Sequence, residues 1–102
     1  MKLTKEKKDR LKQEIRENLS RESEIRKIVV FGSFINSENP EDIDIAIFQD
    51  SEESYLSLVM KYRKLTRKIA RKIPLDIIPI KPGISDNWFL SEIETGEMIY
   101  ER

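Results

Sequence analysis

Two short groups of residues in this chain have the types and spacing needed for chemistry. Gly32 and Ser33 follow the apolar run 28–31, while Asp42 and Asp44 open a second apolar run. A Gly-Ser pair after a buried strand offers backbone N–H groups and a hydroxyl that suit a phosphate at the start of a short helix. Two aspartates at i and i+2 project to the same side of a strand and can bind a hard divalent cation. A phosphate site beside a metal site indicates nucleotide chemistry.

A third carboxylate occurs in a later apolar run. Asp76 lies within residues 75–80, where a charge has no structural purpose. If its strand neighbours that of Asp44, three carboxylates converge and raise one another's pKa unless a cation intervenes. We therefore interpret Asp42, Asp44 and Asp76 as ligands of Mg²⁺. The plainer interpretation is ordinary polar alternation on a half-exposed strand.

The remaining composition limits both the chemistry and the partners. The chain has 102 residues, which suits one domain, and it contains no cysteine and no histidine. Disulfides, thiol nucleophiles, structural zinc sites and imidazole triads are therefore excluded, and proton transfer falls to carboxylate, lysine or tyrosine. Nineteen basic and nineteen acidic residues cancel, so bulk charge favours neither nucleic acid nor membrane as a partner. No apolar run approaches the ~20 residues of a membrane helix, and we expect a cytoplasmic protein.

Apolar periodicity predicts the elements that would position these residues. Leu11, Ile15 and Leu19 recur every fourth residue and predict a helix over 4–20. Strands are predicted over 27–31, 42–48, 74–80 and 98–100. On the second strand, Asp42, Asp44, Ala46 and Phe48 should face one way, while Ile43, Ile45 and Ile47 face a helical layer.

Two further helices complete the predicted fold. Acid-rich residues 50–53 predict the start of a helix that runs to Lys72, with an inner stripe of five residues. Ser85 is predicted to cap a helix that ends at Gly96. The fold class is therefore α+β, with a single mixed sheet and helices packed against it. We divide this one domain into an N-terminal helix (1–22), a core (27–80), and a C-terminal helix and strand (84–102). The inner stripe of the helix predicted to end at Lys72 comprises Tyr55, Leu58, Tyr62, Leu65 and Ile69.

The second half of the central helix is strongly basic. Seven cations fall within residues 61–72, and they could bind RNA or an acidic partner. Because they alternate around a helix, we favour a solvated face and keep RNA binding as the weaker alternative. These residues are Lys61, Arg63, Lys64, Arg67, Lys68, Arg71 and Lys72.

The pattern of apolar-Gly-Ser, loop, Asp-apolar-Asp and a later strand Asp resembles the polymerase β-type nucleotidyltransferases. The resemblance extends over residues 28–100 and is closest to the minimal nucleotidyltransferases (MNT), which consist of the catalytic domain alone. It implies that Gly32 and Ser33 contact the nucleotide phosphates. It also implies that Asp42 and Asp44 hold two divalent metal ions, and that Asp76 completes one metal site and can act as the base.

The resemblance further implies a reaction and a partner. The expected activity is Mg²⁺-dependent transfer of AMP from ATP to a hydroxyl, using two Mg²⁺ ions. Minimal nucleotidyltransferases commonly pair, as antitoxins, with a helical HEPN ribonuclease toxin and modify one of its tyrosines. A chain of this length would need such a partner, or a homo-oligomer, to complete the cleft for the acceptor.

A second function of a different class stays open. Asn36 and Ser37 stand where family members often carry Arg-Gly, and the loop from Phe34 to Glu41 is short. A degenerate phosphate loop would be compatible with a non-catalytic antitoxin or scaffold that neutralises its partner by binding alone.

Overall fold

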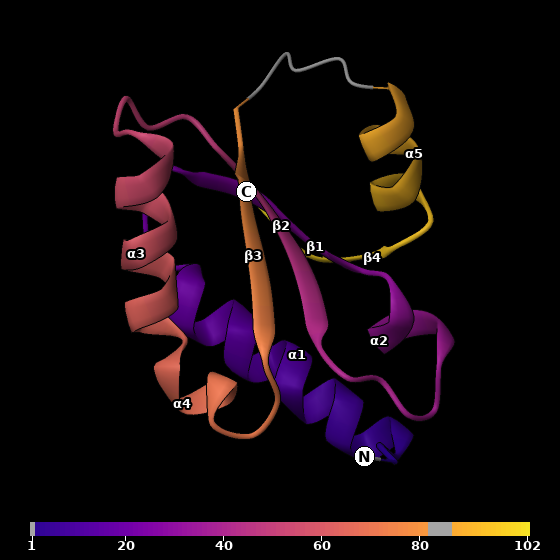
Figure 1. The fold of residues 1–102 in the computed structure, drawn as a ribbon. Helices are drawn as coiled ribbons and strands as arrows, with labels where there is room; N and C mark the ends of the chain where they lie inside the picture. The colour runs from indigo at the N-terminus through magenta and orange to yellow at the C-terminus, as the bar shows by residue number, and fades with distance from the viewer. Residues whose placement is uncertain (1, 82–86) are drawn as a thin grey trace.

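A single mixed sheet forms the centre of the protein in the computed structural model, which describes residues 2–81 and 87–102, with 87–90 by backbone alone (Figure 1). Within this described part, four strands lie in the order β3-β2-β1-β4. β1 pairs antiparallel with both β2 and β4, whereas β2 and β3 are parallel. The predicted α+β class with one mixed sheet is confirmed. The strands are β1 (Ile25–Phe31), β2 (Ile43–Gln49), β3 (Leu75–Ile80) and β4 (Glu97–Glu101).

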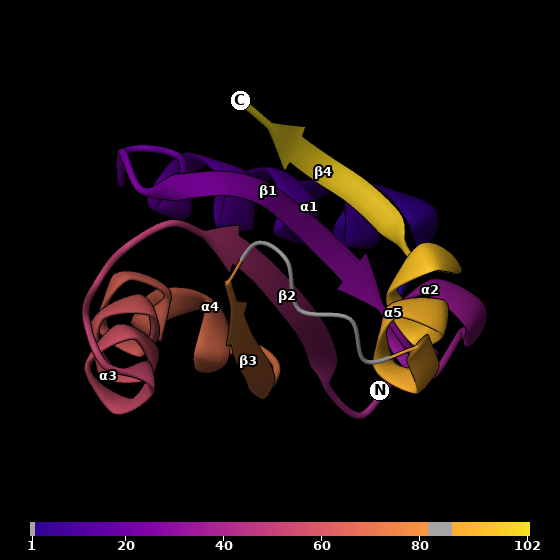
Figure 2. The same cartoon turned by 90° about the horizontal axis from the view of Figure 1, so that it is seen from above.

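Helices cover the two faces of the sheet unequally (Figure 2). One face packs against α1 (Lys5–Leu19), α3 (Tyr55–Leu65) and α4 (Arg67–Ala70) in the larger apolar cluster. The opposite face contributes a smaller cluster that includes Ile93 of α5 (Asn87–Glu94). The single turn α2 (Ser33–Asn36) follows β1 directly. The less covered face is the one to which the aspartates belong.

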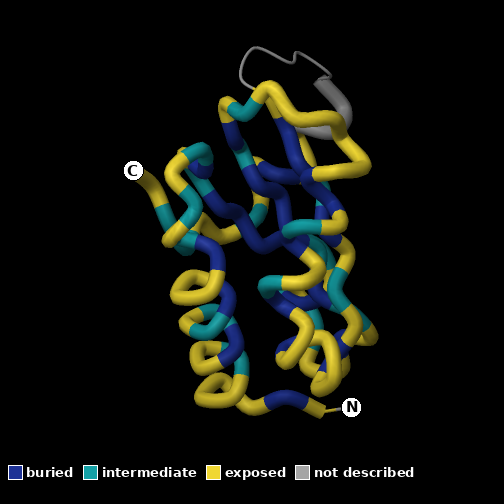
Figure 3. The backbone as a smooth tube through the Cα atoms, turned by 90° about the vertical axis from the view of Figure 1, so that its left-hand side faces the viewer, coloured by how far each residue is buried: buried dark blue, intermediate teal, exposed yellow. Residues whose placement is uncertain are grey.

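Strand alternation explains why the two faces differ. Ile43, Ile45 and Ile47 are fully buried in the larger cluster, while Ala46 and the partly buried Phe48 pack with the smaller one. Side chains along a strand alternate between faces, so the predicted division of β2 is confirmed. Buried residues accordingly concentrate along the strands in Figure 3.

The first helix forms as predicted. Thr4 caps α1, its hydroxyl accepting a hydrogen bond from the backbone N–H of Lys7. Leu11, Ile15 and Leu19 are buried on one side, and the remaining positions are mostly charged. An amphipathic stripe at this spacing buries one face of a helix against the sheet.

The second predicted helix differs from expectation at both its start and its middle. Its cap is Ser54, whose hydroxyl accepts from the N–H of Ser57, so the acidic residues 50–53 lie outside the helix. The helix is also interrupted at Thr66, whose hydroxyl donates to the Tyr62 carbonyl at 2.7 Å. A threonine hydroxyl bonded to the carbonyl of residue i−4 bends helices. Tyr55, predicted on the inner stripe, is 60% exposed.

The remaining boundaries differ by one or two residues from those predicted, as is usual at element ends. β1 begins at Ile25 and β4 extends over Glu97–Glu101. Ser85, predicted as a helix cap, lies outside the described residues. None of the described helices is both long enough and apolar enough to cross a membrane.

Candidate functional site

The last residue of β1 and the first residues of β2 and β3 lie together at one end of these strands. Phe31, the last residue of β1, pairs with Asp44 of β2, and Asp44 in turn pairs with Asp76 of the parallel strand β3. Paired residues on neighbouring strands project to the same face. Asp42 immediately precedes β2 and, two residues before Asp44, continues the same alternation. The register therefore brings together the three aspartates singled out in the sequence.

Gly32 lies close to the carboxylate of Asp44. Its φ angle is 77°, in a region that residues with a side chain rarely adopt. It caps α2 without a side-chain hydrogen bond. A Cβ at Gly32 would overlap the carboxylate of Asp44. Glycine is thus required here both for the turn after β1 and for the close approach of Asp44.

Ser33 starts the single turn that follows this glycine. Its side chain is exposed, and its carbonyl accepts a hydrogen bond from the N–H of Ser37 at 2.8 Å. The Gly32 carbonyl accepts from the N–H of Ile35 at 3.1 Å. The turn presents the Ser33 hydroxyl to solvent, next in the chain to the glycine that touches Asp44. Gly32 and Ser33 thereby lie at the same end of the strands as the aspartates.

The electrostatics of the site are dominated by negative charge. Partial burial, together with repulsion from Asp42 and Asp76, raises the pKa of Asp44 from 3.8 to about 6. Glu92 of α5 adds a smaller repulsive contribution to the same carboxyl. Sequence reasoning did not single out Glu92, because an acidic residue on an exposed helix is ordinary and only the packing of α5 directs it here.

The donor set suits a hard divalent cation. Carboxylate oxygens are the ligands that Mg²⁺ prefers, and a cation would remove the repulsion that raises the pKa of Asp44. In the described part of the chain, no three His, Cys, Asp or Glu side chains are as yet close enough to hold a metal ion.

Two of the solved structures that share this fold are toxin–antitoxin complexes. A structure of the tri-AMPylated HEPN toxin of Shewanella oneidensis in complex with MNT antitoxin matches with a TM-score of 0.61 and 18% identity, covering 93% of this chain and 73% of the other. The MntA-HepT toxin-antitoxin crystal structure matches with a TM-score of 0.52 and 17% identity, covering 93% and 70%. At such identities the likeness shows the fold.

Sequence comparison supplies the family. Among curated proteins, none matches the chain. The family described as "Polymerase beta, Nucleotidyltransferase" matches residues 13–102, which include the whole sheet and every residue of the candidate site. This chain belongs to the polymerase beta nucleotidyltransferase family.

Proposed function

We propose that this protein is a Mg²⁺-dependent nucleotidyltransferase that transfers AMP from ATP to a hydroxyl group of a partner protein. The observation that carries the proposal is the pairing of Asp44 with Asp76, beside a glycine that leaves room for the Asp44 carboxylate. Membership of the nucleotidyltransferase family supports the reaction class. AMP, as the group transferred, is suggested by the AMPylated toxin in the complex of similar fold.

The role proposed for each residue is the one that the resemblance implies. Asp42 and Asp44 would hold two Mg²⁺ ions, with Asp76 completing one of the sites. When bound, these ions neutralise the phosphates and favour ionisation of the acceptor hydroxyl. Gly32 and Ser33 would orient the triphosphate through the backbone and the Ser33 hydroxyl.

The chemical step is an in-line displacement at the α-phosphate. The acceptor oxygen forms a bond to phosphorus while the bond to pyrophosphate breaks, and the hydroxyl proton passes to a base. Asp76 is our choice of base, because its side chain is exposed on the site face and the chain contains no histidine. AMP remains on the acceptor, and pyrophosphate leaves.

The partner would be a HEPN-type helical toxin, and the acceptor one of its tyrosines. The HEPN-type partner is suggested by one similar structure, in which an AMPylated HEPN toxin is in complex with an MNT antitoxin. Tyrosine as the acceptor rests on the resemblance of the sequence motifs alone. The chain would then act as a cytoplasmic antitoxin that silences the toxin by covalent modification.

Transfer of label from ATP tests the proposal directly. The chain is incubated with Mg²⁺, ATP labelled at the α-phosphate, and a co-expressed HEPN-type protein. We expect labelled partner protein, a loss of at least about 10³-fold in Asp42→Asn and in Asp44→Asn, and no labelling in EDTA. Asp50→Asn is the matched control, because Asp50 pairs with Arg26 at the other end of β2 and should retain activity.

The outcomes separate the two candidate functions. Labelling that survives both aspartate changes would reject the assigned site. Neutralisation of the toxin without any labelling would instead support the scaffold, in which the chain acts by binding alone. Binding of Mn²⁺, followed by its paramagnetic signal, checks the metal site independently of any partner and should be lost in Asp44→Asn.

A further inference from the structure

The turn that carries Ser33 is too short to be stable on its own backbone hydrogen bonds. α2 has four residues, whereas isolated helices shorter than about 12 residues are already marginal in water. The N–H of Ile35 donates to the Gly32 carbonyl at 3.1 Å. The N–H of Ser37 donates to the Ser33 carbonyl at 2.8 Å. Contacts with other parts of the chain must therefore hold α2 in place.

Lys8 of α1 contacts this turn at two points. Its ammonium group donates a hydrogen bond to the carbonyl of Ser37, the C-cap of α2, at 2.6 Å. The same nitrogen lies 5.5 Å from the centre of the Phe34 ring, within the range of a cation–π contact. Phe34 is itself fully buried in the larger apolar cluster. Lys8 thus touches both the buried side chain of the turn and the residue that ends it.

The sequence of α2 does not supply this cation itself. Lysine and arginine near the end of a helix can bond its last carbonyls, but α2 has no basic residue in its last turn. Lys8 provides the contact from another helix, 29 residues away in sequence. A backbone contact lies close by, because the N–H of Leu3 donates to the Glu38 carbonyl at 2.9 Å. The start of α1, next to the label N, accordingly lies directly below α2 in Figure 1.

The two ends of the turn are held by different parts of the fold. Gly32 continues directly from β1, so the strand sets where the turn begins. Lys8 binds the residue at which the turn ends. Between these ends Ser33 and Asn36 are exposed. Because both ends are held, the backbone and hydroxyl of Ser33 are restricted to fewer orientations than in a free turn.

We infer that Lys8 is a positioning residue that holds the Gly32–Ser33 turn in the conformation that receives the triphosphate. It acts through its contacts with Phe34 and Ser37, not by touching the nucleotide. This role rests on the proposed function, in which Gly32 and Ser33 orient the triphosphate. A turn that is already ordered binds more tightly, because less ordering has to accompany binding.

Equilibrium dialysis of the full chain with Mg²⁺ and labelled ATP tests this role. Lys8→Met removes the donor and the charge from a partly buried position, and it should raise the Kd for ATP about 5- to 10-fold. Lys8→Arg keeps both charge and N–H donors and should stay within about twofold of wild type. Lys7→Met is the matched control, because it removes the same charge from the exposed neighbouring position and should leave the Kd unchanged. An unchanged Kd in Lys8→Met would overturn the inference.

Transfer kinetics separate positioning from a merely structural role. The turn would hold the triphosphate equally in the ground state and in the transition state. In the labelling assay, Lys8→Met should therefore raise the KM for ATP about 5- to 10-fold and keep kcat within about twofold. A merely structural role would lower kcat per mole of protein, because fewer molecules are folded, and would leave KM unchanged. That second result would overturn the inference.

Amide hydrogen exchange tests the contact without any nucleotide. In Lys8→Met, the amides of Ile35 and Ser37 should exchange about 10-fold faster than in wild type, because the turn opens locally, while the amides of β1 should not change. Weaker ATP binding with unchanged exchange would mean that Lys8 contacts the phosphates directly, and would overturn the positioning role.

The three measurements distinguish failure of this role from failure of the proposed reaction. A wild type that binds ATP but labels no partner would contradict the transfer reaction, and dialysis and exchange would still support or overturn the role of Lys8. A wild type that binds no ATP would overturn both.

Discussion

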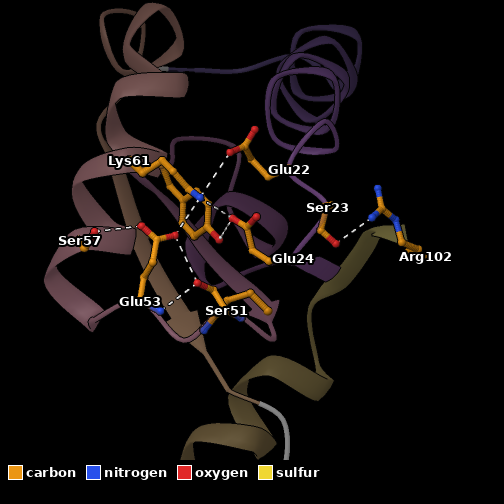
Figure 4. Close-up of polar contacts among 10 residues, drawn as sticks. Glu22, Ser23, Glu24, Ser51, Glu53, Ser57, Lys61 and Arg102 are labelled. Atoms are coloured by element: carbon orange, nitrogen blue, oxygen red, sulfur yellow. Dashed lines mark hydrogen bonds and ion pairs between the residues drawn. The ribbon is translucent and has the colours of Figure 1, made fainter.

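Two groups of acidic side chains in this molecule differ in their electrostatic surroundings, because one group surrounds a lysine and the other contains only carboxylates. Glu22, Glu24 and Glu53 surround Lys61, whose Nζ lies 3.4, 2.8 and 3.1 Å from their carboxylates (Figure 4). Among the described residues, no lysine or arginine forms a salt bridge with any of the three site aspartates. We call these the Lys61 cluster and the aspartate cluster, the latter being Asp42, Asp44 and Asp76.

The pKa directions follow from this difference. Burial raises the pKa of both Glu24 and Asp44, but hydrogen bonds from Lys61 and Tyr62 outweigh burial for Glu24 and lower its pKa overall. At Asp44, burial and neighbouring carboxylates act in the same direction. The Lys61 cluster joins α3 to the segment before β1 and is complete within the chain. The aspartate cluster has no salt-bridge partner among the described residues, which fits the cation site that we propose for it.

The largest test of this comparison removes one carboxylate from each cluster and measures transfer. Asp44→Asn should lower Mg²⁺-dependent labelling at least about 10³-fold, equivalent to about 4 kcal/mol. Glu24→Gln should leave labelling within about twofold, because its partners lie in the Lys61 cluster. Equal losses in both variants, with both folded by circular dichroism, would contradict the division.

Removing the cation of the Lys61 cluster should have the next largest effect. Lys61→Met leaves three carboxylates without their shared partner, and we expect unfolding free energy to fall by about 2 kcal/mol in urea titrations. Lys68→Met is the control, because Lys68 is exposed on α4 and should change stability by less than about 0.5 kcal/mol. Similar losses in the two variants would show that the cluster contributes nothing beyond surface charge.

Removing a charge from the aspartate cluster should raise the unfolding free energy instead of lowering it. Without metal at pH 8, Asp44→Asn removes a repelled charge and should raise the unfolding free energy by about 1 kcal/mol. This is less than the full pKa shift implies, because Asp44 is only partly buried and solvent screens its charge. Its folded-state pKa, about 6, exceeds the ordinary 3.8. Wild-type stability from this carboxyl is therefore present below pH 3.8 and lost as pH rises through about 6.

Urea titrations of both proteins across pH 4 to 8 provide the measurement. The gap between Asp44→Asn and wild type should open as pH rises and close again when Mg²⁺ is added to wild type, because the cation binds only the folded state. A gap that is constant with pH would show that Asp44 is not repelled in the folded protein.

Much of the fold was predictable because its signals are local and periodic. Leu11, Ile15 and Leu19 recur at helical spacing, and isoleucine occupies every second position from 43 to 47 in β2, so element type and buried face followed from the sequence. The interruption at Thr66 was not predictable in this way, since threonine is tolerated within helices and only its bond to the Tyr62 carbonyl shows the bend. The cap at Ser54 was missed because acidic residues just before it also resemble a helix start.

The candidate site was predictable to the extent that its members belong to strands. Asp44 and Asp76 interrupt apolar runs, and such interruptions are visible without any structure. Their direct pairing depends on strand order and register, which the sequence implied only through the resemblance. Glu92 could not be found, because its proximity to Asp44 results from how α5 packs on the sheet.

The smallest expected effect separates the hydroxyl of Tyr62 from the cation of its cluster. Tyr62 is fully buried, and its hydroxyl donates to Glu24 at 2.9 Å. Tyr62→Phe keeps the packed ring and leaves Glu24 paired with Lys61, so unfolding free energy should fall by only about 0.5 to 1 kcal/mol. Tyr55→Phe, at an exposed position, is the control and should have no measurable effect. If Tyr62→Phe cost as much as Lys61→Met, the hydroxyl, rather than the ammonium group, would be the principal partner of Glu24.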